Sequence, residues 1–305
     1  MPGKTRFPNP IELNKSESLS GVNLKRVLSI IVLVLFSASA APAINLRIKI
    51  AGGLGYFNLK DINRALKSRE EFLKEEAAAT AGWNFQGGSI PRFQSGVELE
   101  GELLFLLNER LAFGLGSGYM YGELSPEKTA LTILQGVYSY IYVKPVKVSA
   151  QPLILAGYYF LPLGKKISVF CKAGGGYFWA KFVGREGYRR LPTVNFSYTS
   201  SQLADGHGTV FQAGLGLKVE LEPSVSLFFE ALGRRAKAAG FEGDVRSGIR
   251  GKLFFYEEYI PVLKLWQAKV QLSESTPAGE NFRSVREALV DLNGFSLKMG
   301  IMIQF

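Results

Sequence analysis

An alternation of apolar and polar residues at every second position most constrains how this chain can fold. The stretch from Gly294 to Phe305 shows it clearly. Large apolar residues occupy the odd positions from Phe295 onward, and small or polar residues occupy the even positions apart from one methionine. Successive side chains of a β-strand point to opposite faces, so this pattern predicts a strand with one apolar face. By itself the pattern fits a half-buried strand of a soluble sheet equally well.

Seven further segments share this period, and their connections decide between these fold classes. The segments cover residues 44–57, 97–105, 111–122, 146–161, 167–180, 210–221 and 225–235. Short connections alternate strictly with long ones, which span residues 58–93, 124–145, 182–209 and 242–293. Such alternation is typical of transmembrane β-barrels. We therefore predict an all-β fold, a single eight-stranded antiparallel transmembrane β-barrel with four long extracellular loops and a short helix in the first loop.

The last predicted strand is expected to close this barrel against the first, with its apolar face toward lipid. Segment 146–161 is apolar at both sets of positions, so the sequence does not predict which of its side chains point inward.

The N-terminal region has the pattern of a secretory signal peptide. Lys25 and Arg26 precede an apolar run at 27–36, and small residues follow it. Ten apolar residues are too few for a spanning helix, which needs about 20. Cleavage after Ala40 or after Ala43 fits the pattern, and we favour Ala43. Residues 1–43 are thus predicted to be a signal peptide and residues 44–305 the barrel domain.

Charge and cysteine usage limit what an exported protein of this sequence can contain and contact. The 24 residues before Lys25 make a long N-terminal region, which suggests that translation starts further downstream. Cys171 is the only cysteine, so no intramolecular disulfide can form. The formal net charge is +10, and the mature chain keeps about +7 because residues 1–43 hold five Lys/Arg against two Glu. In an exported protein this positive charge favours contact with anionic lipid head groups over nucleic acid. We expect localisation in the cell outer membrane.

Two stretches resemble a known group of proteins. The ending VDLNGFSLKMGIMIQF resembles the closing strand of small Gram-negative outer-membrane barrels. The stretch NLKDINRAL resembles a feature of outer-membrane β-barrel domain proteins of the OmpW/OmpA-like superfamily. The resemblance implies that the terminal residues form the signal read by the barrel-assembly machinery, at Met299, Ile301, Ile303 and Phe305. It also implies contact with outer-membrane lipids and lipopolysaccharide. Because such families include channels, adhesins and lipid-modifying enzymes, the resemblance predicts location rather than activity.

Charged residues on the predicted inward faces nearly balance. They are Arg47, Lys49, Glu98, Glu100, Glu102, Lys172, Lys218, Glu220, Glu230, Arg234 and Lys298. The basic first strand precedes the acidic second strand, so Arg47 and Lys49 are expected to pair with the glutamate triplet. Such charges can line a selective pore or fill a closed barrel with ion pairs. The near balance and the narrow lumen of eight strands favour the closed interior.

Aromatic residues lie near the loop ends of several predicted strands. They are Tyr56, Tyr119, Tyr121, Tyr177 and Trp179, and we interpret them as an aromatic girdle at the membrane interface.

His207 is the only histidine, and it suggests one alternative function. With Ser200, Ser201 and Asp205 nearby, it raises the possibility of a Ser-His-acid site in a lipid A acyl hydrolase or transferase. The surrounding residues lack motif spacing, so we favour an exposed histidine and a protein that is not an enzyme. One histidine and one cysteine do not make a dedicated metal site, and no cofactor is predicted.

Two loop segments have structure of their own. Residues 61–79 predict a helix with Ile62, Leu66, Arg69 and Leu73 along one stripe, which caps the barrel mouth or contacts a partner. Residues 251–272 are unusually apolar, and they form either a surface for a hydrophobic ligand or extensions of the strands, which we favour.

The predicted function is a structural or binding barrel that passes small hydrophobic solutes. The ligand is not predicted.

Overall fold

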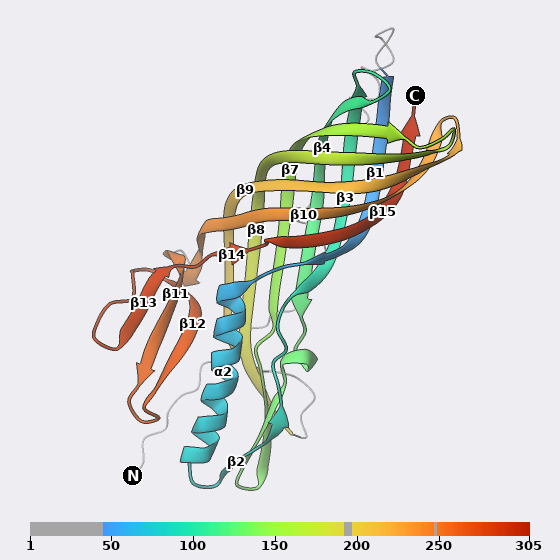
Figure 1. Ribbon diagram of the computed structural model, residues 1–305. Helices are drawn as coiled ribbons and strands as arrows, with labels where there is room; N and C mark the ends of the chain where they lie inside the picture. The colour runs from blue at the N-terminus through green and yellow to red at the C-terminus, as the bar shows by residue number, and fades with distance from the viewer. Residues whose placement is uncertain (1–44, 192–196, 247–248) are drawn as a thin grey trace. The chain divides into compact units, whose positions relative to one another are not determined.

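The computed structural model describes residues 45–191, 197–246 and 249–305 (Figure 1). These residues form one compact unit, which begins at Asn45. The predicted signal peptide at 1–43 lies outside the described residues. Within them, the structure is an antiparallel sheet of 15 strands with a single α-helix and one short 3₁₀-helix.

Eight of these strands pair in a closed cycle. Following the cycle, each strand pairs with the next and the last pairs with the first. In cyclic order they are β1 (Asn45–Tyr56), β3 (Ser95–Leu106), β4 (Leu111–Leu124), β7 (Val146–Pro162), β8 (Ile167–Arg190), β9 (Ser197–Glu222), β10 (Val225–Arg246) and β15 (Gly294–Gln304). The predicted pairing of the final strand with the first is confirmed, since Ile50 lies opposite Ile301. Closure leaves this part of the sheet without an exposed edge.

Three short turns join these strands at one end of the barrel, at residues 107–110, 163–166 and 223–224. The long connections all leave from the other end, as predicted. Three of the four predicted long connections are not simple loops, however. They contain all seven additional strands and the helices, which are α2 (Lys60–Ala79), β2 (Trp83–Gly88), η1 (Glu127–Thr129), β5 (Leu131–Gln135), β6 (Tyr138–Val143), β11 (Ile249–Ile260), β12 (Leu265–Ser273), β13 (Phe282–Glu287) and β14 (Val290–Asp291).

Three barrel strands also run well past the barrel. Strands β8, β9 and β10 contain 24, 26 and 22 residues, whereas about 9–11 residues suffice to cross a bilayer. Their extensions carry β6, β5 and β2 beside β8, and β11 and β12 beside β10. The expectation of a loop at 182–209 was therefore wrong for most of that segment. In contrast, residues 251–272 do form paired strands, as favoured, because β11 and β12 make a hairpin.

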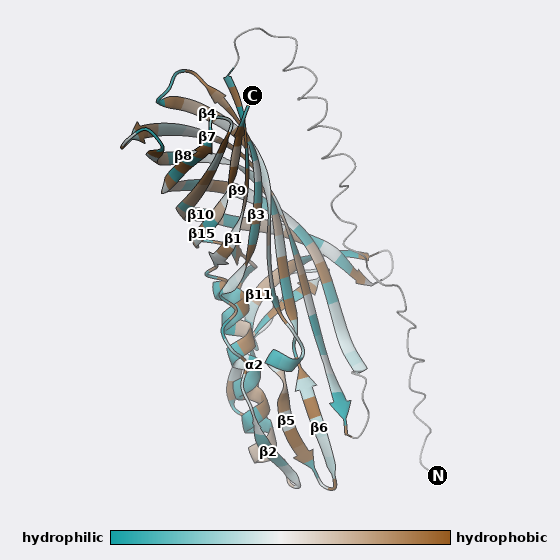
Figure 2. Cartoon of the chain, turned by 90° about the vertical axis from the view of Figure 1, so that its right-hand side faces the viewer, coloured by the Kyte–Doolittle hydropathy of each residue, from teal (hydrophilic) through white to brown (hydrophobic). Residues whose placement is uncertain are grey.

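Helix α2 packs within this extended region (Figures 1 and 2). It covers Lys60–Ala79, 20 residues, so the helix predicted at 61–79 is confirmed to within one residue. Its buried stripe includes Ile62, Leu66 and Leu73, three of the four residues predicted for it. On its exposed face, Lys74 Nζ lies 2.5 Å from Glu70 Oε1, an i,i+4 pair that supports the helix.

Inward glycines make room for large side chains in the barrel. A methyl group at Gly216 would lie 2.1 Å from the ring of Phe170. One at Gly114 would lie 2.2 Å from Oε1 of Glu102. Their place on the inner face explains why a narrow barrel can enclose both aromatic rings and long charged side chains.

Candidate functional site

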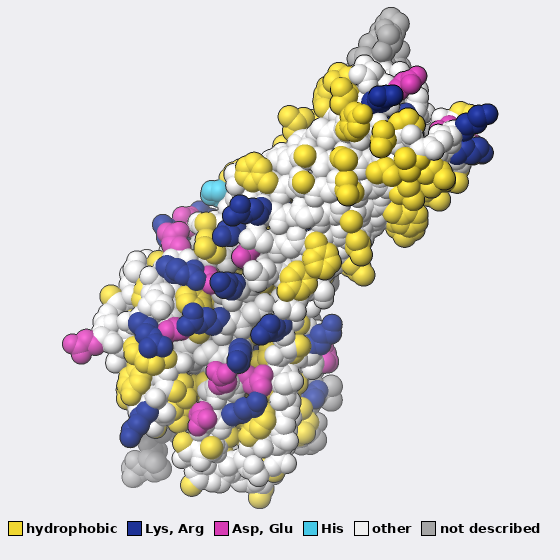
Figure 3. Space-filling model, in the orientation of Figure 1, with side chains coloured by type: hydrophobic (Ala, Val, Ile, Leu, Met, Phe, Trp, Pro, Cys, Tyr) yellow, Lys and Arg dark blue, Asp and Glu magenta, His cyan; other side chains and the backbone are white. Residues whose placement is uncertain are grey.

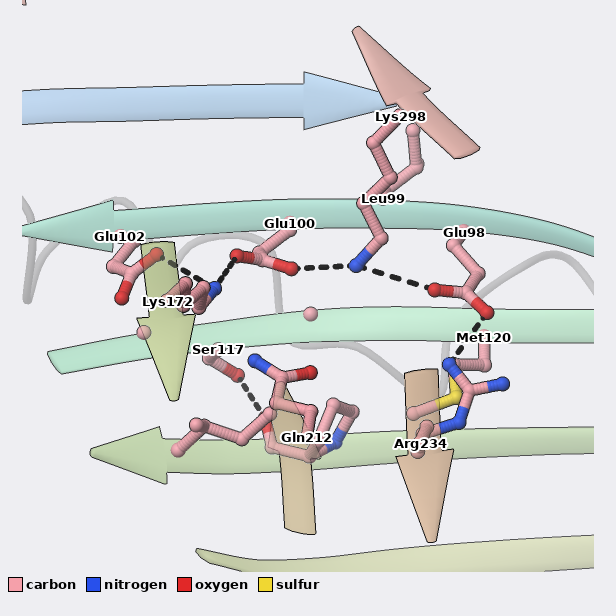
Figure 4. A pocket seen from close by; sticks show the side chains of 14 residues that line it. Glu98, Leu99, Glu100, Glu102, Ser117, Met120, Lys172, Gln212, Arg234 and Lys298 are labelled. Atoms are coloured by element: carbon pink, nitrogen blue, oxygen red, sulfur yellow. Dashed lines mark hydrogen bonds and ion pairs between the residues drawn. The ribbon is translucent and has the colours of Figure 1, made fainter. Parts of the chain in front are cut away.

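The inner faces of five barrel strands meet in a network of buried charges (Figure 4). Alternation along β3 directs every second side chain inward, which is why Glu98, Glu100 and Glu102 lie in one row. Opposite them on β1 stand Gly53, Ala51 and Lys49. Because two of these three residues are small, cationic side chains from more distant strands can reach the row.

The part of the network nearer the long connections is held by two cations. Arg234 of β10 places Nη1 2.6 Å from Oε1 of Glu98. Lys298 of β15 bridges two carboxylates, with Nζ 3.2 Å from Glu98 Oε2 and 2.6 Å from Glu100 Oε2. Each carboxylate of this group therefore faces at least one cation across the barrel.

The part nearer the short turns is denser. Lys172 of β8 places Nζ 2.6 Å from Glu100 Oε1 and 3.0 Å from Glu102 Oε2. Lys49 places Nζ 2.7 Å from Glu230 Oε2 and 3.3 Å from Glu100 Oε1. Charge-assisted hydrogen bonds at these distances are stronger than neutral ones.

Tyr158 of β7 joins this cluster, although the sequence did not identify it. Its hydroxyl donates to Glu102 Oε2 and accepts a hydrogen bond of 3.1 Å from Lys49 Nζ. The Tyr158 ring belongs to an aromatic layer with Phe160, Phe170 and Phe228, whose neighbouring centroids lie 5.6–6.3 Å apart. This layer covers the network on the side of the short turns.

The network is neutral and buried. Four basic residues, Lys49, Lys172, Arg234 and Lys298, balance four acidic ones, Glu98, Glu100, Glu102 and Glu230, and all eight are at most 9% exposed. The cavity beside them has a volume of about 10 Å³, which holds at most one water molecule. Two donors of residues that line this space, Gln212 Nε2 and Arg234 Nη2, have no protein partner among the described residues.

Three other charges predicted to point inward lie outside this network. Arg47 stands opposite Leu104 rather than opposite a glutamate, and its Nε donates to Gln304 at 2.9 Å. The expected pairing of Arg47 with the glutamate triplet was therefore wrong. Lys218 and Glu220 are half-buried on β9 near the short turns. The strand register explains why these three residues lie outside the network. They are level with the aromatic layer or nearer to the short turns than it is.

The outward faces carry the other residues singled out by the sequence. Tyr177 and Trp179 are exposed and pack edge to face, and Tyr56 stacks on Phe295. Tyr119 and Tyr121 stack on each other and are half-buried. On β15 and just beyond it, Met299, Ile301 and Phe305 are exposed and Ile303 is half-buried.

His207 lies on the exposed outer surface of β9, stacked on Tyr177 at 5.7 Å. Ser200, Ser201 and Asp205 occupy the same extended strand. At about 3.3 Å per residue, Ser201 is about 20 Å from His207. These residues therefore do not form the Ser-His-acid site that the sequence suggested. Within the described part of the chain, no group of His, Cys, Asp and Glu is placed to hold a metal ion.

Helix α2 is held in the extended region by charged side chains from both of its flanks. At its first turn, Asp61 accepts bonds of 2.6 and 2.5 Å from both terminal nitrogens of Arg286 on β13. This hydrogen-bonded pairing raises the pKa of Arg286 above its usual value. A carboxylate at a helix N-terminus is also favoured by the helix dipole.

Further along the helix, Arg69 places Nη2 2.5 Å from Glu186 Oε1 on β8, and Lys144 lies 3.3 Å from the other oxygen. Burial by itself would raise the pKa of Glu186, but Lys144 and Arg69 outweigh it and hold that pKa below its usual value. The space between α2 and the strands, lined by Leu66 and Phe182 among others, has a volume of only about 30 Å³. The helix therefore fills the region beyond the barrel mouth.

Among the residues that the structure describes, no helix combines the length and the apolar character needed to cross a membrane.

Comparison with known proteins gives structural matches alone. No family model matches the chain, and no curated protein matches it significantly. A major outer membrane protein from Thermus thermophilus is 15% identical, with a TM-score of 0.38, over 85% of this chain and 99% of that chain. Neisserial surface protein A is 10% identical, with a TM-score of 0.33, over 86% of this chain and 97% of that chain. The outer membrane protease OmpT from Escherichia coli is 9% identical, with a TM-score of 0.32, over 88% of this chain and 100% of that chain.

Proposed function

We propose that this protein is an integral outer-membrane protein of a Gram-negative cell, an eight-stranded transmembrane β-barrel with a closed interior and a structural or binding role. The observation that carries the membrane assignment is a belt of exposed apolar side chains around the closed cycle of strands. All eight strands contribute to it, through Ile50, Leu54, Val97, Leu99, Phe113, Leu115, Leu153, Leu155, Ile167, Phe211, Leu215, Phe229, Leu297 and Met299. Exposed apolar surface on this scale marks contact with another apolar phase.

Charge distribution supports the same assignment. Apart from Arg235 of β10, the outward positions of the eight strands carry no charged side chain between the short turns and the aromatic residues. A charge on the lipid face costs about 2–4 kcal/mol near the bilayer midplane. Figure 3 shows the consequence on one face, where apolar side chains cover the barrel and most charges gather on the extended region and at the short turns. The short turns then face the periplasm and the extended region faces the exterior.

The neutral network and helix α2 support the proposal that the barrel interior is closed. An aqueous channel needs a continuous water path, and in this barrel four ion-paired cations, an aromatic layer and a packed helix occupy that path. Passage of small hydrophobic solutes therefore requires a route other than the barrel axis. We infer a role in binding or in the architecture of the cell envelope. The alternative, a lipid-modifying enzyme, lacks support from His207, because among the described residues Ser200 and Ser201 lie far from it along β9.

Cell fractionation with gel migration tests the membrane assignment. The mature chain should be recovered with the outer membrane and require detergent for extraction. An unheated sample should migrate differently from a boiled one, because a closed barrel resists unfolding by detergent. Recovery of a folded, detergent-free protein from the periplasm would contradict the assignment.

A further inference from the structure

Strands β11 and β12 end in an apolar turn that the barrel does not explain. The turn covers residues 261–264, and residues 259–266, which we call the hairpin tip, read YIPVLKLW with Lys264 as their one charged residue. Turns on protein surfaces are usually polar, with Gly, Pro, Asn or Asp where the backbone needs them. Val262 is nevertheless 88% exposed. Packing within the chain therefore does not account for the apolar character of this turn.

The hairpin tip is apolar on both of its faces. Tyr259 stands opposite Trp266, and Ile260 stands opposite Leu265. Successive pairs along two strands point to opposite faces, so one face carries two aromatic rings and the other carries two aliphatic side chains. The rings of Tyr259 and Trp266 lie 5.2 Å apart. A hairpin that packs on a flat protein surface needs apolar residues on one face only, whereas this tip suits an apolar phase that surrounds it.

Charged side chains begin immediately behind the hairpin tip. Glu257 and Glu258 precede it on β11 and point to opposite faces. Arg283 Nε lies 2.6 Å from Glu257 Oε2, and Lys269 Nζ lies 2.5 Å from Glu258 Oε2. The guanidinium of Arg283 also lies 4.1 Å from the centre of the Trp266 ring. Aromatic rings at the end of an apolar segment, next to charged groups, are typical of the boundary between lipid and water.

Strand pairing places the hairpin tip at the far end of its sheet. Strand β13 runs from the tip back toward the barrel, since Phe282 stands opposite Glu258 and Glu287 stands opposite Phe254. Strand β14 follows and pairs with β10, and β15 then enters the barrel. Figure 1 shows the turn between β11 and β12 directed away from the barrel. The tip therefore points away from the membrane in which we place the barrel.

We propose that the hairpin tip inserts into the interface of a second phospholipid bilayer, one that faces the cell surface. Val262 and Leu263 enter the boundary of the acyl chains, and the two aromatic rings lie at the level of the head groups. Three strand steps from Tyr259 to Val262 span about 10 Å at most, which matches the depth of interfacial segments. Lys264 extends to the lipid phosphates, as long basic side chains do. This inference rests on the proposed function, because the tip faces outward only if the barrel spans the outer membrane.

Flotation with vesicles tests this insertion. The mature protein is held in phosphatidylcholine nanodiscs and mixed with separate phosphatidylcholine vesicles, whose neutral surface keeps the net charge of the protein from driving the binding. A density gradient then measures the fraction of protein that floats with the vesicles. We expect the wild-type chain to float in proportion to the vesicle concentration, because burial of the apolar tip favours association.

A matched pair of single variants locates the contact. Burying one valine side chain contributes at least about ten-fold to affinity, so V262D should lower the affinity for vesicles by at least that factor. The control is V137D, in the two-residue turn between β5 and β6, where Val137 is 91% exposed. Its turn partner is Gly136, so this turn lacks an apolar tip, and V137D should float as the wild type does.

A second measurement does not depend on the aspartate variants. In W83F/W179F, Trp266 is the one remaining tryptophan. With a scaffold protein that lacks tryptophan, its fluorescence should shift to the blue when vesicles are added and should be quenched by vesicles of brominated phosphatidylcholine. Unchanged emission and quenching would overturn the proposal.

Flotation has two outcomes that would also overturn it. An inserted wild-type chain that stays with the nanodiscs would show that the tip is covered by something other than lipid, such as a protein pocket. An equal loss in V262D and V137D would show that any exposed valine has the same effect. The heat-dependent gel shift in nanodiscs is measured separately, and a wild-type chain without it would contradict the proposed function itself.

Discussion

Replacing Glu100 with glutamine should destabilise the barrel strongly, and by an amount that depends on pH. Glu100 is the most connected carboxylate of the network, since its oxygens lie 2.6 Å from Lys172 and from Lys298 and 3.3 Å from Lys49. Glutamine keeps the shape of the side chain and removes its charge. The surrounding cations then exceed the remaining carboxylates by one. Breaking a buried pair in this way costs about 3–5 kcal/mol.

The cost of E100Q cannot exceed the free energy that one lysine of the network needs to release its proton. A lysine with an ordinary pKa of about 10.4 can lose its proton at pH 7 for about 4.6 kcal/mol, and at pH 9 for about 2 kcal/mol. The destabilisation by E100Q should therefore shrink as the pH rises, because a neutral lysine relieves the excess charge. A substitution that harmed only packing would show no such dependence.

Equilibrium urea unfolding in lipid vesicles, followed by the gel shift, measures this effect. The control is E287Q, which removes an exposed partner of Lys252 at 2.7 Å and should cost less than about 1 kcal/mol at either pH. A value for E100Q as small as that of the control, at both pH values, would refute the reasoning. It would mean that water reaches the network and that the lumen is not closed.

Three further perturbations have definite expected results. Deleting Phe305, the last outward residue, should leave aggregated chain in the periplasm, as measured by fractionation, whereas normal outer-membrane levels would contradict an assembly role. D61N should weaken the contact with Arg286 by about 1–3 kcal/mol and expose α2 to protease, while the gel shift of the barrel persists, and an unchanged digestion rate would argue against this contact. Because the pKa of Glu186 is held below its usual value, its contribution is present at neutral pH and is lost as the pH falls below about 4.5, through the depressed pKa. Hydrogen exchange of α2 should accelerate in that range, and E186Q should abolish the dependence.

The sequence predicted the barrel well because two different environments act on its strands. With lipid outside, as proposed, and charge inside, successive residues of β3 alternate, so Glu98, Glu100 and Glu102 could be assigned from spacing alone. On β7 this contrast disappears, since the aromatic layer inside and lipid outside both select apolar residues. The inward direction of Tyr158, and hence its bond with Glu102, could not be predicted for that reason.

Which charges pair depends on the position of each residue along the barrel axis, and alternation along a strand does not give that position. Arg47 has the same orientation as Lys49, but it lies one strand repeat closer to the short turns, opposite Leu104. The extended strands were missed for another reason. Beyond the membrane neither face meets lipid, so the residues of β8 after Trp179 keep apolar side chains only where α2 or a neighbouring strand covers them, as at Phe182.

Single-channel recording in planar lipid bilayers tests the central claim most directly. The wild-type chain should show no steady conductance, because in the proposed closed interior the buried network from Lys49 to Arg234 and helix α2 block the barrel axis. The insertion of protein is verified by its heat-dependent gel shift in the same lipid. A large, stable conductance from inserted wild-type protein would contradict the closed interior.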